Sequence, residues 1–421
     1  MLEGILQNKI SARALPLAVV LPGGRRVGPA DAALTLRLSE LSALAPLAQG
    51  QIGLVARAYV EGRLDFEGSL RSLMSIAAQL IDADPVGTPK PVAPLTWWRD
   101  LLFAARSRSR HRPELDAAQI QFHYDVSDDF YRLWLDPQQV YSCAYFSAPA
   151  MTLAQAQAAK LDHICRKLML REGERFLDVG AGWGALLLHA AQRYGVRGHG
   201  ITLSRNQHAH VSRLIGEHGL TGRVTVELCD YRALPETQRY DKIASVGMFE
   251  HVGRARLPDY FAKLARLLEP GGLLMNHGIT AGGTRNDRLG AGMGDFIERY
   301  IFPGGELLHL SHVLKVMSEA RLEPLDIENL RPHYARTLWA WSDALEAQLP
   351  QARALASESV VRAFRLYLAG SAMCFEHGWI SLHQMLAART TGNVAGSVAD
   401  GAMRGAQSSY PFNRGYMYPS P

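Results

Sequence analysis

The sequence predicts an α/β fold, in which helices cover both faces of a parallel sheet, preceded by a small N-terminal α+β domain. Between residues 119 and 388, short apolar runs alternate with helical stretches, and each apolar run ends in a glycine-rich or polar loop. Residues 82–96 contain prolines and a glycine that interrupt regular structure. We therefore expect two domains, over residues 1–92 and 119–388, joined by a linker over 93–118 and followed by a tail over 389–421.

The composition is typical of a soluble globular protein. Of 421 residues, 48% are hydrophobic and 20% are charged, which is ordinary for this class. The four cysteines show neither zinc-site spacing nor a disulfide framework, so we expect a reducing, cytoplasmic location. No apolar run reaches the roughly 18 residues that a membrane-spanning helix needs. The net charge of +5 fits an anionic partner, either lipid or nucleic acid.

The N-terminal domain is predicted to contain three strands and a helical segment in two pieces. Residues 17–28 have the pattern of two short strands around a Gly-Gly turn, and residues 30–39 that of a third strand. Residues 52–81 carry apolar residues at helical spacing and are broken near Gly62. This content indicates a small α+β unit.

The linker combines aromatic and basic residues. Trp97 and Trp98 precede a segment rich in arginine that ends at Arg112. Such a segment could lie on an anionic membrane, or it could be a solvated linker whose tryptophans dock on the next domain; the sequence leaves both open. The tail is rich in small and polar residues, and we expect most of it to be mobile.

Five apolar runs predict the strands of the larger domain. These runs lie at residues 175–184, 195–204, 223–231, 240–253 and 271–280, with helical stretches such as 185–195 and 260–272 between them. Functional residues of such sheets gather beyond the carboxyl ends of the strands. The loops that follow these runs are therefore the first place to look for a site.

The loop after the first of these strands predicts a cofactor site. Gly180, Gly182 and Gly184 are spaced G-x-G-x-G, and Asp178 precedes them at the strand end. A dinucleotide site would have the spacing G-x-G-x-x-G and an acidic residue about 20 positions later, whereas the second strand here ends in ITLSRNQ. This pattern suits S-adenosylmethionine, a cationic ligand without a phosphate, in a class I (Rossmann-like) methyltransferase sheet. The alternative is a plain β–α turn.

Two further positions allow two interpretations each. Asp230 could accept a hydrogen bond from the adenine of the cofactor, with Tyr231 packed on the ring, or could cap the following turn. Cys143 lies in the aromatic stretch YSCAYF. It could be a packed core residue or part of a site.

Taken together, the motifs resemble the cyclopropane fatty acyl phospholipid synthases and their mycolic acid relatives. The resemblance is close over residues 119–388 and weaker in the N-terminal domain, through IGLVARAYVEGRLDFEG. The motifs that carry it are HYDVSDDFYRLWLDPQQVYSCAYF, FLDVGAGWGA, GITLSRNQ, DYRAL, SVGMFEHVG, RYIFPGG and HYARTLWAW. YSCAYF together with GMFEHVG is the specific pair, because the glycine loop alone indicates only a class I methyltransferase.

The resemblance implies an activity and two cofactors, S-adenosylmethionine and bicarbonate. Family enzymes transfer a methylene unit from S-adenosylmethionine to a cis double bond of a phospholipid acyl chain, through a carbocation, with bicarbonate as the base. It further implies that the N-terminal domain has a sterol-carrier-like fold that engages lipid. We accordingly expect a cytoplasmic protein that associates peripherally with the membrane and has unsaturated phospholipid acyl chains, not nucleic acid, as its partner. Whether the protein forms a homodimer is left open.

The resemblance also implies roles for individual residues of this chain. The bicarbonate site would be Cys143, Glu250, His277, the Ile279 backbone and Tyr334. The cofactor site would be Tyr141, Ser142, Asp178, Gly180, Ala181, Gly182, Trp183, Gly184, Thr202, Gln207, Asp230 and Tyr231. His277 could instead be a core histidine, Glu250 could cap a helix, and His251 would at most orient its neighbour.

One departure from the family pattern concerns the C-terminal helix. Many members carry a cysteine where this chain has Ser371, with Cys374 one turn later. A thiolate at 371 is impossible here, but carbocation chemistry needs no covalent enzyme intermediate. The alternatives are an acyl methyltransferase that makes methylene- or methyl-branched chains, or a non-catalytic lipid-binding protein. A nucleic acid methyltransferase is disfavoured, because MFEHVG replaces the Asn/Asp-Pro-Pro-aromatic turn of amino-methylating enzymes.

Overall fold

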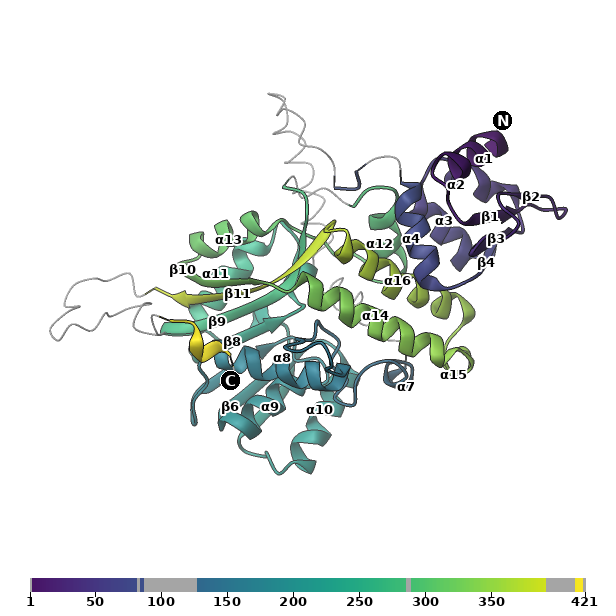
Figure 1. The fold of residues 1–421 in the computed structure, drawn as a ribbon. Helices are drawn as coiled ribbons and strands as arrows, with labels where there is room; N and C mark the ends of the chain where they lie inside the picture. Colours follow the sequence, from purple (N-terminus) through teal and green to yellow (C-terminus); the bar gives the residue numbers. More distant parts are fainter. Residues whose placement is uncertain (1, 82–83, 87–126, 285–288, 391–412, 419–421) are drawn as a thin grey trace, which may run out of the picture.

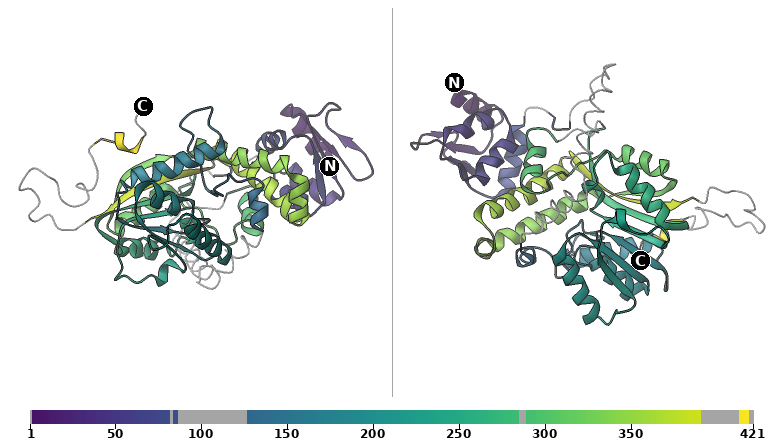
Figure 2. Two further views of the ribbon diagram at one scale, coloured as in Figure 1. Left: turned by 90° about the horizontal axis from the view of Figure 1, so that it is seen from below. Right: turned by 180° about the vertical axis from the view of Figure 1, so that it is seen from behind.

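The computed structural model describes residues 2–81, 84–86, 127–284, 289–390 and 413–418 (Figure 1). The predicted linker 93–118 lies outside these residues. The chain forms a smaller N-terminal domain and a larger α/β domain, which two long helices join side by side (Figures 1 and 2).

The N-terminal domain is an α+β unit, as its sequence indicates. In the described residues its sheet has four strands in the order β2-β1-β3-β4, with β1 parallel to β3 and the other pairs antiparallel. The strands are β1 (Leu17–Val20), β2 (Arg26–Val27), β3 (Leu34–Leu38) and β4 (Leu64–Glu67). The helices are α1 (Leu2–Ala12), α2 (Leu44–Ala48), α3 (Ile52–Val60) and α4 (Leu70–Leu80).

The structure departs from the sequence prediction at two places in this domain. The helix α1 was not predicted. The break near Gly62 contains the strand β4, which pairs with β3 so that Phe66 lies opposite Leu36. Such a short strand depends on its cross-strand partner rather than on local propensity, and the sequence pattern alone therefore missed it.

The larger domain contains the five predicted strands and two further strands that the sequence analysis did not predict. The described part of this sheet has seven strands in the order β10-β11-β9-β8-β5-β6-β7. They are β5 (Arg175–Val179), β6 (Arg197–Thr202), β7 (Val224–Leu228), β8 (Tyr240–Val246), β9 (Leu268–Ala281), β10 (Leu322–Asn329) and β11 (Ile380–Arg389). The five predicted strands are mutually parallel, but β11 runs antiparallel to both β9 and β10, so the sheet is mixed.

Alternate residues of the strands face opposite layers of helices, as expected for a sheet covered on both sides. Leu177 of β5 packs in one layer with α11 and α13, and Phe176 packs in the other with α8, α9 and α10. These helices are α8 (Leu153–Lys167), α9 (Ala185–Tyr194), α10 (Arg205–Glu217), α11 (Leu257–Leu267) and α13 (Leu310–Glu319). The end of the chain, residues 413–418, docks on α8, where buried Met417 accepts a hydrogen bond from His163 Nδ1 at 3.0 Å.

A helical layer connects the two domains (Figure 2). Its members are α7 (Asp128–Arg132), α12 (Met293–Tyr300), α14 (Arg331–Ala347), α15 (Leu349–Leu355) and α16 (Glu358–Glu376). The α3 and α4 helices of the N-terminal domain pack on α16, and α3 also packs on α12. In the described parts of the chain, no helix has the length and apolar character needed to cross a membrane.

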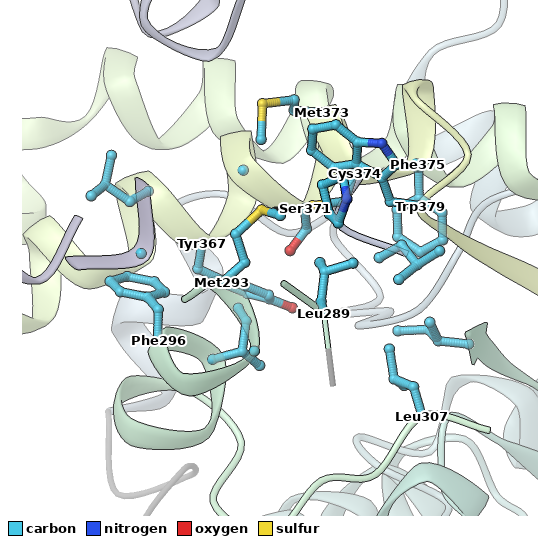
Figure 3. A pocket seen from close by; sticks show the side chains of 18 of the residues that line it. Leu289, Met293, Phe296, Leu307, Tyr367, Ser371, Met373, Cys374, Phe375 and Trp379 are labelled. Atoms are coloured by element: carbon cyan, nitrogen blue, oxygen red, sulfur yellow. Dashed lines mark hydrogen bonds between the residues drawn. The ribbon is translucent and has the colours of Figure 1, made fainter. Parts of the chain in front are cut away.

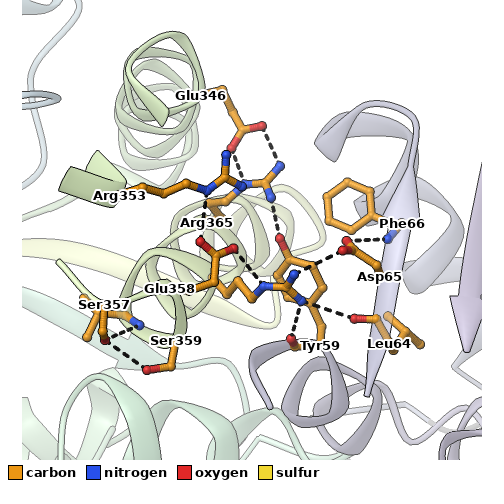
Figure 4. Close-up of polar contacts among 12 residues, drawn as sticks. Tyr59, Leu64, Asp65, Phe66, Glu346, Arg353, Ser357, Glu358, Ser359 and Arg365 are labelled. Carbon is orange, nitrogen blue, oxygen red and sulfur yellow. Dashed lines mark hydrogen bonds and ion pairs between the residues drawn. The ribbon is translucent and has the colours of Figure 1, made fainter. Parts of the chain in front are cut away.

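Two arginines of α16 hold the N-terminal domain in place (Figure 4). Arg365 bonds Glu346 of α14 with both ends of its guanidinium, at 2.6 and 2.9 Å, and also donates to the Tyr59 hydroxyl of α3. Arg362 donates to the Tyr59 carbonyl at 3.0 Å and to Asp65 at 3.1 Å. We call these residues, Tyr59, Asp65, Glu346, Arg362 and Arg365, the domain clamp.

Replacing Arg365 should weaken the attachment of the N-terminal domain. The Arg365 side chain is only 12% exposed, and hydrogen bonds to charged groups contribute roughly 1.5–3 kcal/mol. We expect Arg365→Met to lower the free energy of unfolding by about 2 kcal/mol, measured by urea denaturation. Arg353→Met is the control, because Arg353 is 47% exposed and pairs with Glu358 at the surface. Equal losses in the two variants would contradict the clamp.

Candidate active site

Two cavities open where the parallel strands end. The smaller, of about 190 Å³, lies over the loops that follow β5, β6, β7 and β8. The larger, of about 710 Å³, begins beside β8 and β9 and extends toward the N-terminal domain. The position of both at the carboxyl edge of the sheet agrees with the usual location of sites in this architecture.

The smaller cavity brings together the residues predicted for the cofactor. Asp178, the glycine loop, Thr202, Gln207, Asp230 and Tyr231 line it, together with Tyr141 and Ser142 from the segment before α8. Ala181 and Trp183 also line it, and Gly184 is the exception. Gly184 instead immediately precedes α9 as its N-cap, where a Cβ atom would lie 2.9 Å from Val211.

The glycine loop has the backbone that its sequence predicts. Gly180, Gly182 and Gly184 all have positive φ values, of 81°, 55° and 85°, which strain other residues. A Cβ atom at Gly182 would meet no atom within 4 Å. The backbone of this loop is therefore open to a ligand.

A buried lysine that the sequence patterns did not reveal also lines the smaller cavity. Lys160 of α8 is 2% exposed, and its Nζ donates to Ser142 Oγ at 2.8 Å. Burial lowers the pKa of Lys160 to about 8, and burial raises the pKa of Asp178 to about 7, while Lys160 opposes that rise. Asp178 Oδ2 has no hydrogen-bond partner among the described residues. The cavity thus holds a cation and a carboxyl group that can bind the two charged ends of an amino acid.

The remaining polar groups of this cavity are partly satisfied. Thr202 donates to Gln207 Oε1 at 2.8 Å, while Gln207 Nε2 has no partner in the described chain and is available to a ligand. Asp230 accepts from the Arg232 backbone at 2.8 Å and from the Arg232 guanidinium at 2.6 Å. The capping interpretation of Asp230 therefore applies in this structure, although Asp230 and Tyr231 also line the cavity.

The larger cavity contains the residues predicted for the anion. Cys143, Glu250, His277, Ile279 and Tyr334 line its end beside the sheet. They come from elements distant in sequence: the segment before α8, the loop after β8, the strand β9, and α14. The fold therefore brings all five to one place.

Glu250 is held against β9 rather than capping a helix. Its Oε1 accepts from the Ile279 backbone at 2.6 Å, while its Oε2 has no partner among the described residues. Gly278 makes this approach possible, because a Cβ atom there would lie 2.7 Å from Glu250 Oε1. Burial raises the pKa of Glu250 to about 7. The Ile279 N–H, predicted to bind an anion, is thus occupied by Glu250.

His277 is fully buried, and neither ring nitrogen has a hydrogen-bond partner in the described structure. Burial, with Lys160 and Lys167 nearby, lowers its pKa well below the usual range, so the ring is neutral. Gln384 lies opposite it on β11, and Glu328 lies opposite Gln384 on β10. A core histidine without partners is unfavourable unless a ligand completes its hydrogen bonds.

Cys143 is a neutral donor in this environment. Burial raises the pKa of its thiol far above the usual range. Its Sγ lies 3.2 Å from the Ala144 carbonyl oxygen and 3.9 Å from that of Leu330. The aromatic neighbours of Cys143 in YSCAYF lie in different places. Tyr141 lines both cavities, whereas the Tyr145 ring stacks between those of His163 and His333, with ring centroids 4.3 and 4.9 Å apart.

Four residues line both cavities: Tyr141, Ser142, Gly247 and His251. The two cavities therefore adjoin at these four residues, which we call the shared wall, near Glu250 and Cys143. A ligand in the small cavity and a chain in the large one would meet at these residues. The sequence assigned His251 only an orienting role and did not single out Gly247.

Comparison with known proteins identifies the family. The family model described as mycolic acid cyclopropane synthetase matches residues 111–385, more than half of the chain. The chain belongs to this family. A Pseudomonas putida protein named probable fatty acid methyltransferase is 44% identical over 377 residues, which cover 89% of this chain and 92% of that relative.

Solved structures of the family agree with the fold. The cyclopropane synthase MmaA2 from Mycobacterium tuberculosis has a TM-score of 0.62 at 38% identity, over 65% of this chain and 98% of its own. Mycolic acid cyclopropane synthase CmaA1, complexed with SAH and CTAB, has a TM-score of 0.61 at 39% identity with the same coverage. The predicted class I fold and family are thus confirmed, and the protein is an S-adenosylmethionine-dependent methyltransferase of the cyclopropane synthase family.

The position where many family members carry a cysteine lies in the larger cavity. Ser371 of α16 points its hydroxyl into that cavity, and Cys374 lines the same wall one turn later (Figure 3). Burial raises the pKa of Cys374 to about 12, and its Sγ lies 3.9 Å from Met293 Sδ. Cys374 is therefore a neutral thiol and does not replace a thiolate nucleophile.

Lys160 gave no signal in the sequence because it is one polar residue in a helix without a motif. Its role depends on Ser142, 18 positions earlier, and on Asp178, 18 positions later. Only the approach of α8 to the glycine loop reveals it.

The affinity for the cofactor should depend on Lys160 acting through Ser142. We expect Lys160→Met to weaken binding of S-adenosylhomocysteine about tenfold, or about 1.4 kcal/mol, measured by titration calorimetry. Ser142→Ala should weaken it too, and the double variant should be no weaker than the worse single variant, because contacting residues are not additive. Lys242→Met is the control, since Lys242 is buried near Glu174, outside the cavity. Full additivity would contradict this coupling.

The pKa of Glu250 predicts a pH-dependent stability. Its folded pKa of about 7 exceeds the ordinary value of 4.5, so the folded protein binds more protons and the free energy of unfolding falls as pH rises between these values. Glu250→Gln should remove this loss. The difference in free energy of unfolding between the variant and the wild type should shift in favour of the variant by on the order of 3 kcal/mol between pH 5 and pH 8, as measured by urea denaturation. A difference that does not change with pH would refute it.

Proposed function

We propose that the protein transfers a methylene unit from S-adenosylmethionine to a cis double bond of a phospholipid acyl chain and so forms a cyclopropane ring. The observation that carries this proposal is the wall shared by the two cavities, Tyr141, Ser142, Gly247 and His251. The smaller cavity, which contains the residues predicted for the cofactor, and the larger, mainly apolar cavity meet there. Holding two reactants in line in this way supplies a large part of a rate enhancement.

The cofactor assignment rests on the charge and shape of the smaller cavity. S-adenosylmethionine, when bound, supplies the methyl group. Lys160 and Asp178 offer opposite charges to its amino acid end, and Gln207 offers a free amide donor. The CmaA1 relative was solved with SAH and CTAB. CTAB is a long-chain alkylammonium detergent, and a long chain in that relative supports an acyl chain here.

The residues at the sheet end of the larger cavity fit a small anion such as bicarbonate. His277 and Glu250 Oε2 have no partners in the described chain, and Cys143 and Tyr334 line the same space. Bicarbonate, if bound there, would accept the proton that the added methyl group loses on ring closure. Below about pH 7 Glu250 carries a proton, and can then donate a hydrogen bond to the anion rather than repel it.

We further propose that the acyl chain belongs to a membrane phospholipid, which the protein engages from the cytoplasmic face. The apolar far end of the larger cavity supports a hydrocarbon substrate. The linker 93–118, with its tryptophans and arginines, suits an anionic surface.

A second product class is favoured by one observation. The Pseudomonas putida relative, at 44% identity over most of both chains, is named a fatty acid methyltransferase. If the intermediate carbocation loses its proton elsewhere, the product is a methylene-branched chain, which a separate reductase would have to reduce to give a methyl-branched chain. The same assay separates the two.

The direct test is to incubate the protein with S-adenosylmethionine and vesicles of a cis-unsaturated phospholipid, and to analyse the acyl chains by mass spectrometry before and after hydrogenation. A chain heavier by one methylene that takes up no hydrogen is the expected result. A heavier chain that takes up hydrogen would indicate branching, and no mass change would overturn the proposal.

The anion site is tested with His277→Leu and with bicarbonate. Removing a buried, unpartnered group should not destabilise the fold, yet the rate should fall about 100-fold or more, as for loss of proton-transfer assistance. Wild-type activity should fall in carbon dioxide-free buffer and recover with added bicarbonate. Ser371→Ala, on the same cavity, should stay within about twofold. Activity insensitive to both His277 and bicarbonate would exclude this site.

A further inference from the structure

We propose that the interior of the N-terminal domain holds the methyl-terminal part of the acyl chain, so that this domain selects substrates by the number of carbons beyond the reacting bond. This inference rests on the acyl substrate of the proposed function. The site is the end of the larger cavity farthest from Glu250, and its ligand class is a saturated hydrocarbon segment.

The larger cavity enters the core of the N-terminal domain. There it is lined by Leu36 and Phe66 from the sheet, by Val55 from α3, and by Leu73 and Ala77 from α4. Val55, Leu73 and Ala77 remain partly accessible although they pack against the hydrophobic core. All three line the cavity, so the side chains of the described residues leave a space between the sheet and these helices.

The cavity is continuous between the domains through α12 and α16. Met293 and Phe296 of α12 and Tyr367 and Ser371 of α16 line its middle part (Figure 3). Gly370 of α16 and Met74 of α4 both line the cavity where these two helices face each other, and a Cβ atom on Gly370 would lie 3.9 Å from Met74 Sδ, at ordinary van der Waals distance. A chain that begins at the shared wall can therefore pass α16 and reach α4.

The polarity of the cavity sets the direction of the chain. Most of its charged and hydrogen-bonding residues, Glu250, His251, Arg254, His277 and Glu306, lie at the end beside the sheet, and Glu298 lies on α12 between the two domains. The part inside the N-terminal domain is lined by aliphatic and aromatic side chains. A head group or carboxylate could not be solvated there, so the methyl end is the end that enters.

Contacts on two sides of the cavity fix the N-terminal domain relative to the larger domain. The Gly53 backbone of α3 donates to the Ala291 carbonyl at 2.9 Å. No side chain fits at this crossing, because a Cβ atom on Gly53 would lie 2.0 Å from the Gly292 carbonyl oxygen. The domain clamp, Arg365 with Tyr59 and Glu346, fixes the other side (Figure 4). The depth of the cavity is therefore a fixed length.

An unfilled space in a domain core is unfavourable, because protein interiors are close-packed and voids lose contacts. A domain that only supported the catalytic domain would pack better without it. The ligand that suits this space is the tail of an acyl chain whose reacting double bond lies at the sheet end of the cavity.

Filling the cavity inside the N-terminal domain tests this. The substrates are phospholipids that share one head group and one number of carbons between the carboxyl group and the double bond. They differ only in the number of carbons beyond the double bond, and they are mixed in the same vesicles so that they compete for the enzyme. Ala77→Phe should lower conversion of the longest tail relative to the shortest about tenfold or more. Ala78→Phe is the matched control on the same helix, because Ala78 does not line the cavity, and should leave the ratio within about twofold.

The outcomes separate this inference from the proposed function. If the wild type is active and Ala77→Phe, verified as folded by circular dichroism, leaves the ratio unchanged, the inference is overturned while the proposed function stands. If the wild type converts no lipid, the proposed function fails. Photo-crosslinking of the wild type then decides: a fatty acid with a diazirine at its methyl end should label peptides of α3 or α4. Labels confined to residues beyond 127 would overturn the inference.

Discussion

Glu250, His277 and Cys143 are polar groups buried at the sheet end of the larger cavity, and the surrounding structure must accommodate them. Each is buried, and burial pushes each toward its neutral form: the pKa of Glu250 rises to about 7, that of Cys143 rises and that of His277 falls. The neutral forms avoid placing an uncompensated charge in the protein interior. The approach of Glu250 to β9 in turn requires Gly278, where a side chain would collide with Phe249 and Glu250.

The same constraint explains why a polar cofactor and a hydrocarbon chain need separate cavities. Lys160 and Asp178 place an amine and a carboxyl group on the cofactor side of the shared wall, where each favours the charged form of the other. On the other side, α12 and α16 present thioether, aromatic and small side chains to the chain (Figure 3). Tyr141, which belongs to both cavities, is the aromatic ring in position to face positive charge on either side.

Local sequence patterns predicted the elements whose signals lie within a few residues. The strand, loop and helix around Asp178 and Gly182 appear as expected, and the five parallel strands place Glu250 and His277 together at one edge. The antiparallel strand β11, the short strand β4 and the role of Lys160 were missed, because each is determined by a partner far away in the sequence. The cavity in the N-terminal domain could not be predicted either, since Leu36, Phe66 and Ala77 are ordinary core residues by sequence and only their packing leaves a space.

The contact between α3 and α16 has a consequence for synthesis of the chain. Tyr59 and Arg362 are bonded although 303 positions separate them. The N-terminal domain leaves the ribosome first, and α16 follows on the order of 15–60 s later at bacterial translation rates of roughly 5–20 residues per second. During that interval the apolar lining of the nascent domain has no covering helix. The N-terminal domain can therefore complete its packing against α16 only after nearly the whole chain has been made.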